Sequence, residues 1–228
     1  KRENLRRSPR FILPCLALGS ATFIMQASES VSSVCFNSSL QTYGGDIAVG
    51  AMTILTSVMQ FAMLPLQGLG QGAQPIISYN YGAGDLGRVR GGFGLLLKVS
   101  LGYATCLWLL VMLFPGVFSA LFTSDPQLAS FASTALRIYM GTMFLMGIQI
   151  ACQMTFNALG KAAESIAVAV MRKFVLLIPL IYIMPRLLSS SQTMAVYLAE
   201  PIADFIAVTF TVILFTVRFR KATAGNIE

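Results

Sequence analysis

Six long apolar stretches occupy nearly the whole chain, and they decide what class of protein it can form. They cover approximately residues 11–36, 47–79, 91–115, 127–157, 162–188 and 192–217. A helix needs about 20 apolar residues to cross a hydrocarbon core, and each stretch is long enough. With 56% hydrophobic and only 11% charged residues, a soluble globular domain is excluded. The sequence therefore predicts an all-α membrane protein with six transmembrane helices in one domain.

The basic residues indicate how these helices are oriented. If the N-terminus is cytoplasmic, 14 of the 16 Lys and Arg residues fall on the cytoplasmic side, and only Arg137 and Arg186 fall on the outer half. The cytoplasmic set includes Arg172 and Lys173, which we assign to the junction of the fourth and fifth stretches. This asymmetry follows the positive-inside rule. We therefore expect a multi-pass protein of the cell's inner (plasma) membrane with both termini cytoplasmic and no nucleic-acid partner.

Several chemistries are excluded by what the sequence lacks. It contains no histidine, which excludes histidine-based catalysis and zinc–histidine sites. Its four cysteines are widely spaced without a CxxC pair, and no P-loop is present. We expect neither enzymatic activity nor a cofactor. The chain begins inside a charged segment without an initiator methionine, so we expect it to be part of a longer protein.

Glu29 is the polar residue that most strongly suggests a function. It is the one acidic residue deep in the first stretch, with apolar residues on both sides. Gln26 and Ser33 share its helical face, at i−3 and i+4. Polar groups at membrane depth are costly and usually face the protein interior. We expect this set to hold a proton or Na⁺, with no other metal site; the alternative is a protonated carboxyl group that only packs against a neighbouring helix.

Amide side chains form two stripes on otherwise apolar helices. The second stretch carries Gln60, Gln67, Gln71 and Gln74 on one face, and the fourth carries Gln149, Gln153 and Asn157 at steps of four. Together with Asn37, we expect these residues to line a wet substrate cavity. The alternative is that they form hydrogen bonds between helices.

Glu200 and Asp204 lie at i and i+4 around a proline at the start of the sixth stretch. They could bind a coupling cation together with groups of the first stretch, or they could cap and orient a helix near the outer surface. Arg137 could pair with one of these acids or extend outward to the membrane surface. The residues alone leave both questions open.

Several segments resemble the multidrug and toxic compound extrusion (MATE) transporters. The most specific is Pro65–Gly84 (PLQGLGQGAQPIISYNYGAG), followed by Arg88 and Arg90. Further similarity lies in Asn157–Lys161 with Arg172 and Ile178–Leu180, and in Phe23–Ser30 with Asn37–Asp46. The resemblance covers essentially the whole chain. It implies a twelve-helix transporter built from two six-helix lobes, of which this chain is the C-terminal lobe and the N-terminal lobe is absent.

The resemblance also implies an activity. Members of the family export organic cations or drugs in exchange for Na⁺ or H⁺ by alternating access, and Glu29 matches the glutamate of the family's cation site in the first helix of this lobe. The partner acid of the fourth helix has no counterpart, because no Asp or Glu lies between Asp125 and Glu164. Coupling would then use Glu29 alone, Glu200 with Asp204, or the other lobe.

Two other functions compete with ion-driven efflux. A related lipid-linked oligosaccharide flippase should have a more cationic cavity for pyrophosphate, whereas few Lys or Arg residues are expected at the centre of these stretches. A membrane scaffold that transports nothing would need neither the polar stripes nor Glu29.

Overall fold

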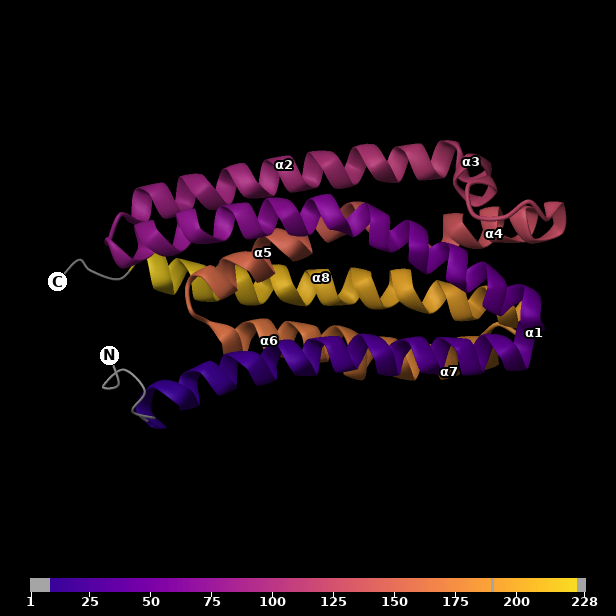
Figure 1. Cartoon of the computed structure of the whole chain (residues 1–228), viewed down its shortest axis with the longest axis horizontal. Helices are drawn as coiled ribbons and strands as arrows, with labels where there is room; N and C mark the ends of the chain where they lie inside the picture. The colour runs from indigo at the N-terminus through magenta and orange to yellow at the C-terminus, as the bar shows by residue number, and fades with distance from the viewer. Residues whose placement is uncertain (1–8, 190, 225–228) are drawn as a thin grey trace, which may run out of the picture.

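The computed structural model describes residues 9–189 and 191–224, all of it helices and short connections without a strand in that part of the chain. The first element, α1 (Pro9–Gly82), consists of two helical arms joined at Gly45, whose φ of 63° lies in the left-handed region that glycine adopts without strain. In Figure 1, the chain runs the length of the molecule, turns back at this point, and returns beside α2. The two arms correspond to the first two predicted stretches.

The remaining elements follow in chain order. They are α2 (Leu86–Leu113), α3 (Pro115–Ala120), α4 (Pro126–Tyr139), the 3₁₀ turn η2 (Met143–Leu145), α5 (Met146–Ala158), α6 (Ala162–Val170), the π-helical segment η3 (Met171–Leu177), α7 (Ile178–Leu187) and α8 (Gln192–Ala224). Figure 1 shows α1 beginning and α8 ending at the same end of the bundle. The predicted all-α membrane fold is confirmed.

By length and composition, four helices among the described residues could cross a membrane, or five if a bent pair is counted. One of the four, Ala27–Gly82, has 56 residues, more than twice the about 20 that one crossing needs, and it contains the turn at Gly45. With the bent pair counted as one crossing and this helix counted as two arms, the described residues contain six crossings, as predicted. The exact span boundaries remain a prediction.

The predicted fourth stretch is not one straight helix. Its halves, Pro126–Tyr139 and Met143–Ala158, are bent by 48° across a short break. The break frees backbone carbonyls, and at membrane depth these need partners within the protein. The indole Nε1 of Trp108 donates to the carbonyl of Gly141 at 3.0 Å, so a neighbouring helix supplies one such partner.

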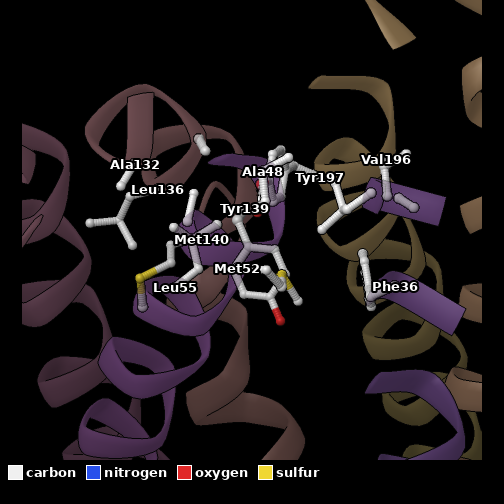
Figure 2. Close-up of a cluster of buried hydrophobic side chains, with 14 of the residues drawn as sticks. Phe36, Ala48, Met52, Leu55, Ala132, Leu136, Tyr139, Met140, Val196 and Tyr197 are labelled. Carbon is white, nitrogen blue, oxygen red and sulfur yellow. Dashed lines mark hydrogen bonds between the residues drawn. The ribbon is translucent and has the colours of Figure 1, made fainter. Parts of the chain in front are cut away.

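The core is formed by apolar side chains of both arms of α1, together with α4 and α8. Figure 2 shows part of this cluster, including Leu55, Leu136 and Met140, all fully buried. The ring of Phe36 meets the edge of the Tyr139 ring, with 6.1 Å between centroids. The same cluster includes Val196 and Tyr197, so it also packs α8 against the two arms of α1.

Two further contacts hold the helices in register. The hydroxyl of Tyr197 on α8 donates to the carbonyl of Ala48, 2.7 Å away, just after the turn of α1. Gly147 on α5 lies so close to α2 that an added Cβ would be 2.6 Å from the carbonyl oxygen of Ser100. Small residues at such crossings let membrane helices approach backbone to backbone.

Candidate functional site

Five charged side chains from three helical segments meet in the bundle. Arg172 and Lys173 come from η3, Glu200 and Asp204 from α8, and Glu29 from the first arm of α1. We call these five residues the charge cluster. It joins residues that are far apart in the sequence, and it is the largest group of ion pairs among the described residues.

The inner half of the charge cluster consists of Arg172, Glu200 and Asp204. Its Nε lies 2.5 Å from Oδ1 of Asp204, and its Nη2 lies 3.0 Å from Oε1 of Glu200. The two carboxylate side chains are only 2–3% exposed. A planar guanidinium with several donors suits this double contact, because each nitrogen can serve a different acid. Arg172 thus ties η3 to α8.

Lys173 and Glu29 form the outer half. Nζ of Lys173 lies 3.0 Å from Oε2 of Glu29 and 3.6 Å from Oε1 of Glu200, so one ammonium group serves two acids. The Lys173 side chain is 9% exposed, whereas that of Glu29 is 58% exposed. Glu29 is therefore the end of the cluster that a molecule from outside the lobe can reach.

Local backbone features explain how these residues come together. On an α-helix the side chains of adjacent residues point in clearly different directions. A π turn contains more residues per turn, so the angle between the side chains of Arg172 and Lys173 is smaller. Here the N–H of Ile178 bonds to the carbonyl of Lys173, five residues back, just before Pro179, which lacks an N–H. On α8, Glu200 and Asp204 are separated by one helical turn and share a face.

The charge cluster lies far from the ends of its helices. Arg172 is ten residues from the start of α6 at Ala162, or about 15 Å along the helix at 1.5 Å per residue. Asp204 is twelve residues from the start of α8 at Gln192, or about 18 Å. If each helix begins at one edge of a hydrocarbon core about 30 Å thick, both positions fall near the middle of that core.

This position corrects the sequence-based assignment of Arg172 and Lys173. They do not lie at a cytoplasmic junction but inside the helical segment Ala163–Leu187. The structure thus places two basic residues at the centre of one helical segment. The signal that could have revealed them is a basic pair flanked by apolar residues on both sides. Arg172 of this pair lies 28 and 32 residues before the two acids of another stretch.

The cluster contains three acids and two bases. With all five ionised, one negative charge remains without a counter-charge. An uncompensated charge inside a membrane protein is costly. The arrangement is therefore suited to take up one further positive charge, either a proton or a cation. Among the described residues there is no group of three or more acids or cysteines with the geometry of a metal site.

The structure separates the other predicted site residues. Ser33 and Asn37 are exposed on the same arm as Glu29, and Gln60, Gln67 and Gln71 are exposed on the second arm of α1. Gln149 and Gln153 are instead buried inside the lobe, and Asn157 is half-buried. The two amide stripes thus do not lie on one common surface of this chain. The side chain of Gln26 lies outside the part that the structure describes.

The structure shows where Arg137 and the two acids of α8 lie. Glu200 and Asp204 are paired with Arg172 at depth, which does not fit a cap near the outer surface. Arg137 is exposed on α4 beside a hollow lined by Leu113 and Phe114. Glu200 is connected to Glu29 of the first stretch through Lys173.

A shallow apolar groove lies between the second arm of α1 and α2. It has a volume of about 610 Å³ and is lined on one side by Pro65, Gly68 and Gly72 and on the other by Leu95 and Val99. This volume is within the range of small-molecule sites. Gln67 and Gln71 are exposed next to these lining residues in the sequence.

Comparison with known proteins places the chain in a family. Residues 21–183 match the MatE family model. The multidrug export protein MepA of Staphylococcus haemolyticus is 24% identical over 217 residues, which are 92% of this chain and 46% of that protein. An FAD transporter of Shewanella oneidensis is 29% identical over 133 residues, which are 58% of this chain and 29% of that protein.

Solved structures agree with this result. The MATE multidrug transporter DinF-BH, in complex with R6G, is 32% identical with a TM-score of 0.79, covering 94% of this chain and 47% of that one. A MOP superfamily transporter from Pyrococcus furiosus shares the fold, with a TM-score of 0.86 at 19% identity over 99% of this chain and 50% of that one. The chain spans about half the length of these relatives. Because the family model matches well over half of its residues, the chain belongs to the MatE family, the MATE transporters.

Proposed function

We propose that this chain is the C-terminal six-helix lobe of an antiporter that exports drugs or amphipathic organic cations across the plasma membrane. A Na⁺ or H⁺ gradient would drive export by alternating access against an N-terminal lobe. The observation that carries the proposal is the charge cluster near mid-depth, with one more acid than base. Family membership supports it, and so does the multidrug transport named for the relatives.

The acid excess supports a coupling role for the cluster. A coupling site must hold one positive charge in one state of the cycle and release it in another. Arg172 contacts both buried acids, and Lys173 is shared between Glu200 and Glu29, so the two bases balance only two of the three acids. The remaining capacity for a proton or Na⁺ would then lie at Glu29, where exposure gives access.

The exposed faces of α1 support the proposed substrate class. Glu29 offers a carboxylate to a cationic group. The groove between α1 and α2 offers an apolar surface, with Gln67 and Gln71 close by in the sequence as hydrogen-bonding groups. An amphipathic cation has complementary parts for both surfaces. Gln60, Asn37 and Ser33 are further polar groups on exposed faces of α1.

The charge balance also bears on the flippase alternative. Arg172 and Lys173 are central basic residues, as a pyrophosphate site would need, but acids contact both. With one more acid than base, the cluster favours cations over anions. A scaffold without transport would gain little from such a group, because buried ion pairs are often no more stabilising than apolar packing.

Substitution of Glu29 tests the proposed coupling. In the complete transporter, Glu29→Gln should retain expression, because glutamine is nearly isosteric and neutral. Efflux of a fluorescent cationic dye, driven by an imposed pH or Na⁺ gradient in proteoliposomes, should fall severely. Asp46→Asn is the matched control, since Asp46 is exposed at the turn of α1 and should tolerate the change. Normal gradient-driven efflux by Glu29→Gln would show that the coupling site lies elsewhere.

Expression of the chain alone tests whether it is one lobe. Alternating access needs a second lobe to move against. In a drug-sensitive bacterium, residues 1–228 alone should confer no resistance, whereas co-expression with the other lobe should restore some. Resistance from the chain alone would indicate a homodimer of this lobe instead.

A further inference from the structure

The two halves of the charge cluster differ in how firmly they are held. Arg172 contacts two acids that are almost completely buried. The Lys173–Glu29 pair joins a buried ammonium group to a carboxylate that is 58% exposed. A carboxylate that is more than half exposed is open to competition from other cations, which the two buried carboxylates of the inner half are not. The Lys173–Glu29 contact is thus the one that can open without disrupting the inner half.

Lys173 also has a second acid available when it leaves Glu29. Its Nζ is already 3.6 Å from Oε1 of Glu200. The flexible four-carbon stem of lysine allows a small shift of the ammonium group toward that acid. Opening the outer pair therefore does not leave a buried, unpaired cation.

A hydroxyl group near Glu29 lacks a partner. Ser32 follows Glu29 by three residues, so the two side chains are neighbours along the first arm of α1. It is 3% exposed, and its Oγ has no hydrogen-bond partner among the described residues. Because this hydroxyl is buried, it can assist only a proton or a small ion at Glu29, and an organic cation would meet the exposed carboxylate alone.

We infer that Lys173 is a built-in competitor for the cation site at Glu29. At rest its ammonium group occupies the Glu29 carboxylate. An incoming monovalent organic cation displaces it, and Lys173 then stays with Glu200. This inference rests on the proposed function, and it adds a residue that sets how tightly cationic substrates bind. The charge of the cluster explains the exchange, since five ionised groups with one excess acid can accept one external cation.

The test measures binding of tetraphenylphosphonium to the purified complete transporter in lipid nanodiscs by calorimetry. Lys173→Gln removes the competitor and should tighten binding about fivefold, which corresponds to about 1 kcal/mol of binding free energy. Binding of the neutral triphenylphosphine oxide should not change. Lys98→Gln, the same loss of charge at an exposed position of α2, is the matched control for long-range electrostatics and should have little effect.

Two further variants test whether the effect depends on the charge of Lys173 and on Glu29. Lys173→Arg retains the charge and can hold a carboxylate with two nitrogens, so it should weaken tetraphenylphosphonium binding. In the double variant Glu29→Gln/Lys173→Gln, the gain should disappear. If Lys173→Gln folds but binds the cation no more tightly, or if its gain persists without Glu29, the inference is wrong. A wild-type transporter that binds and exports no organic cation would instead refute the proposed function itself.

Discussion

Replacing Arg172 by methionine should destabilise the lobe, because Arg172 holds the charge cluster together. Methionine preserves length and apolar packing but removes the cation that contacts Glu200 and Asp204. Glu200 would then keep only the 3.6 Å contact with Lys173, and Asp204 would lose the ion pair at 2.5 Å. Breaking a buried ion pair by removing one partner costs about 3–5 kcal/mol. If the lobe melts as its own unit, that corresponds to a melting temperature lower by about 6–20 °C, and the shift is smaller if both lobes melt together.

The assay is thermal stability of the detergent-solubilised complete transporter, followed by size-exclusion chromatography after heating. Arg137→Met is the matched control, since Arg137 is exposed and should tolerate the change. The triple variant Arg172→Met/Glu200→Gln/Asp204→Asn removes both acids along with their cation, and it should recover most of the loss. Normal stability of Arg172→Met, or a triple variant less stable than the single one, would refute the reasoning.

Three other outcomes follow from the structure. Gly147→Ala should lower the free energy of unfolding by about 1–3 kcal/mol, because the added Cβ would overpack against α2. Gly102→Ala, with nothing within 4 Å of its added Cβ, should be tolerated, and thermal melts compare the two variants directly. Tyr197→Phe should lower stability by about 1 kcal/mol in the same melts, because the buried carbonyl of Ala48 loses its donor; an unchanged melt would mean that this bond contributes nothing. In a cysteine-free background, cysteine at position 189 should react with an impermeant thiol reagent added outside and cysteine at position 86 should not, and the reverse pattern would invert the topology.

The sequence predicted the helical membrane fold because long apolar runs have few other stable forms. It did not predict the break after Tyr139, where Gly141 and Thr142 sit within an otherwise apolar run. That break depends on Trp108 of α2 and on the carbonyl of Pro201, which accepts a hydrogen bond from Thr142. Such contacts between distant segments leave no local pattern.

The candidate site was predicted only in part. Glu29, Glu200 and Asp204 stand out as acids in apolar stretches, and the structure connects all three through Lys173 and Arg172. The two basic residues were assigned to a helix end because most Lys and Arg in membrane proteins lie there. A pair of charges can be recognised as internal only when its counter-charges are known. Those of Arg172 are 28 and 32 residues away, and Glu29, which contacts Lys173, lies in a different stretch near the start of the chain. The exposure of Glu29 also depends on tertiary packing, which helical periodicity does not report.

The position of Arg172 and Lys173 has a consequence for how the chain enters the bilayer during synthesis. The most apolar 18 residues of the segment Ala163–Leu187 have a mean hydropathy of 2.2, yet the segment carries both basic residues near its centre. On insertion scales each central Lys or Arg opposes entry by about 2.5–3.5 kcal/mol. Their counter-charges arrive with α8, which begins at Gln192, shortly after α7 ends at Leu187. The last two crossings would therefore leave the translocon together as a paired unit, and a nascent chain stopped before α8 would be held at the membrane with its basic pair unneutralised.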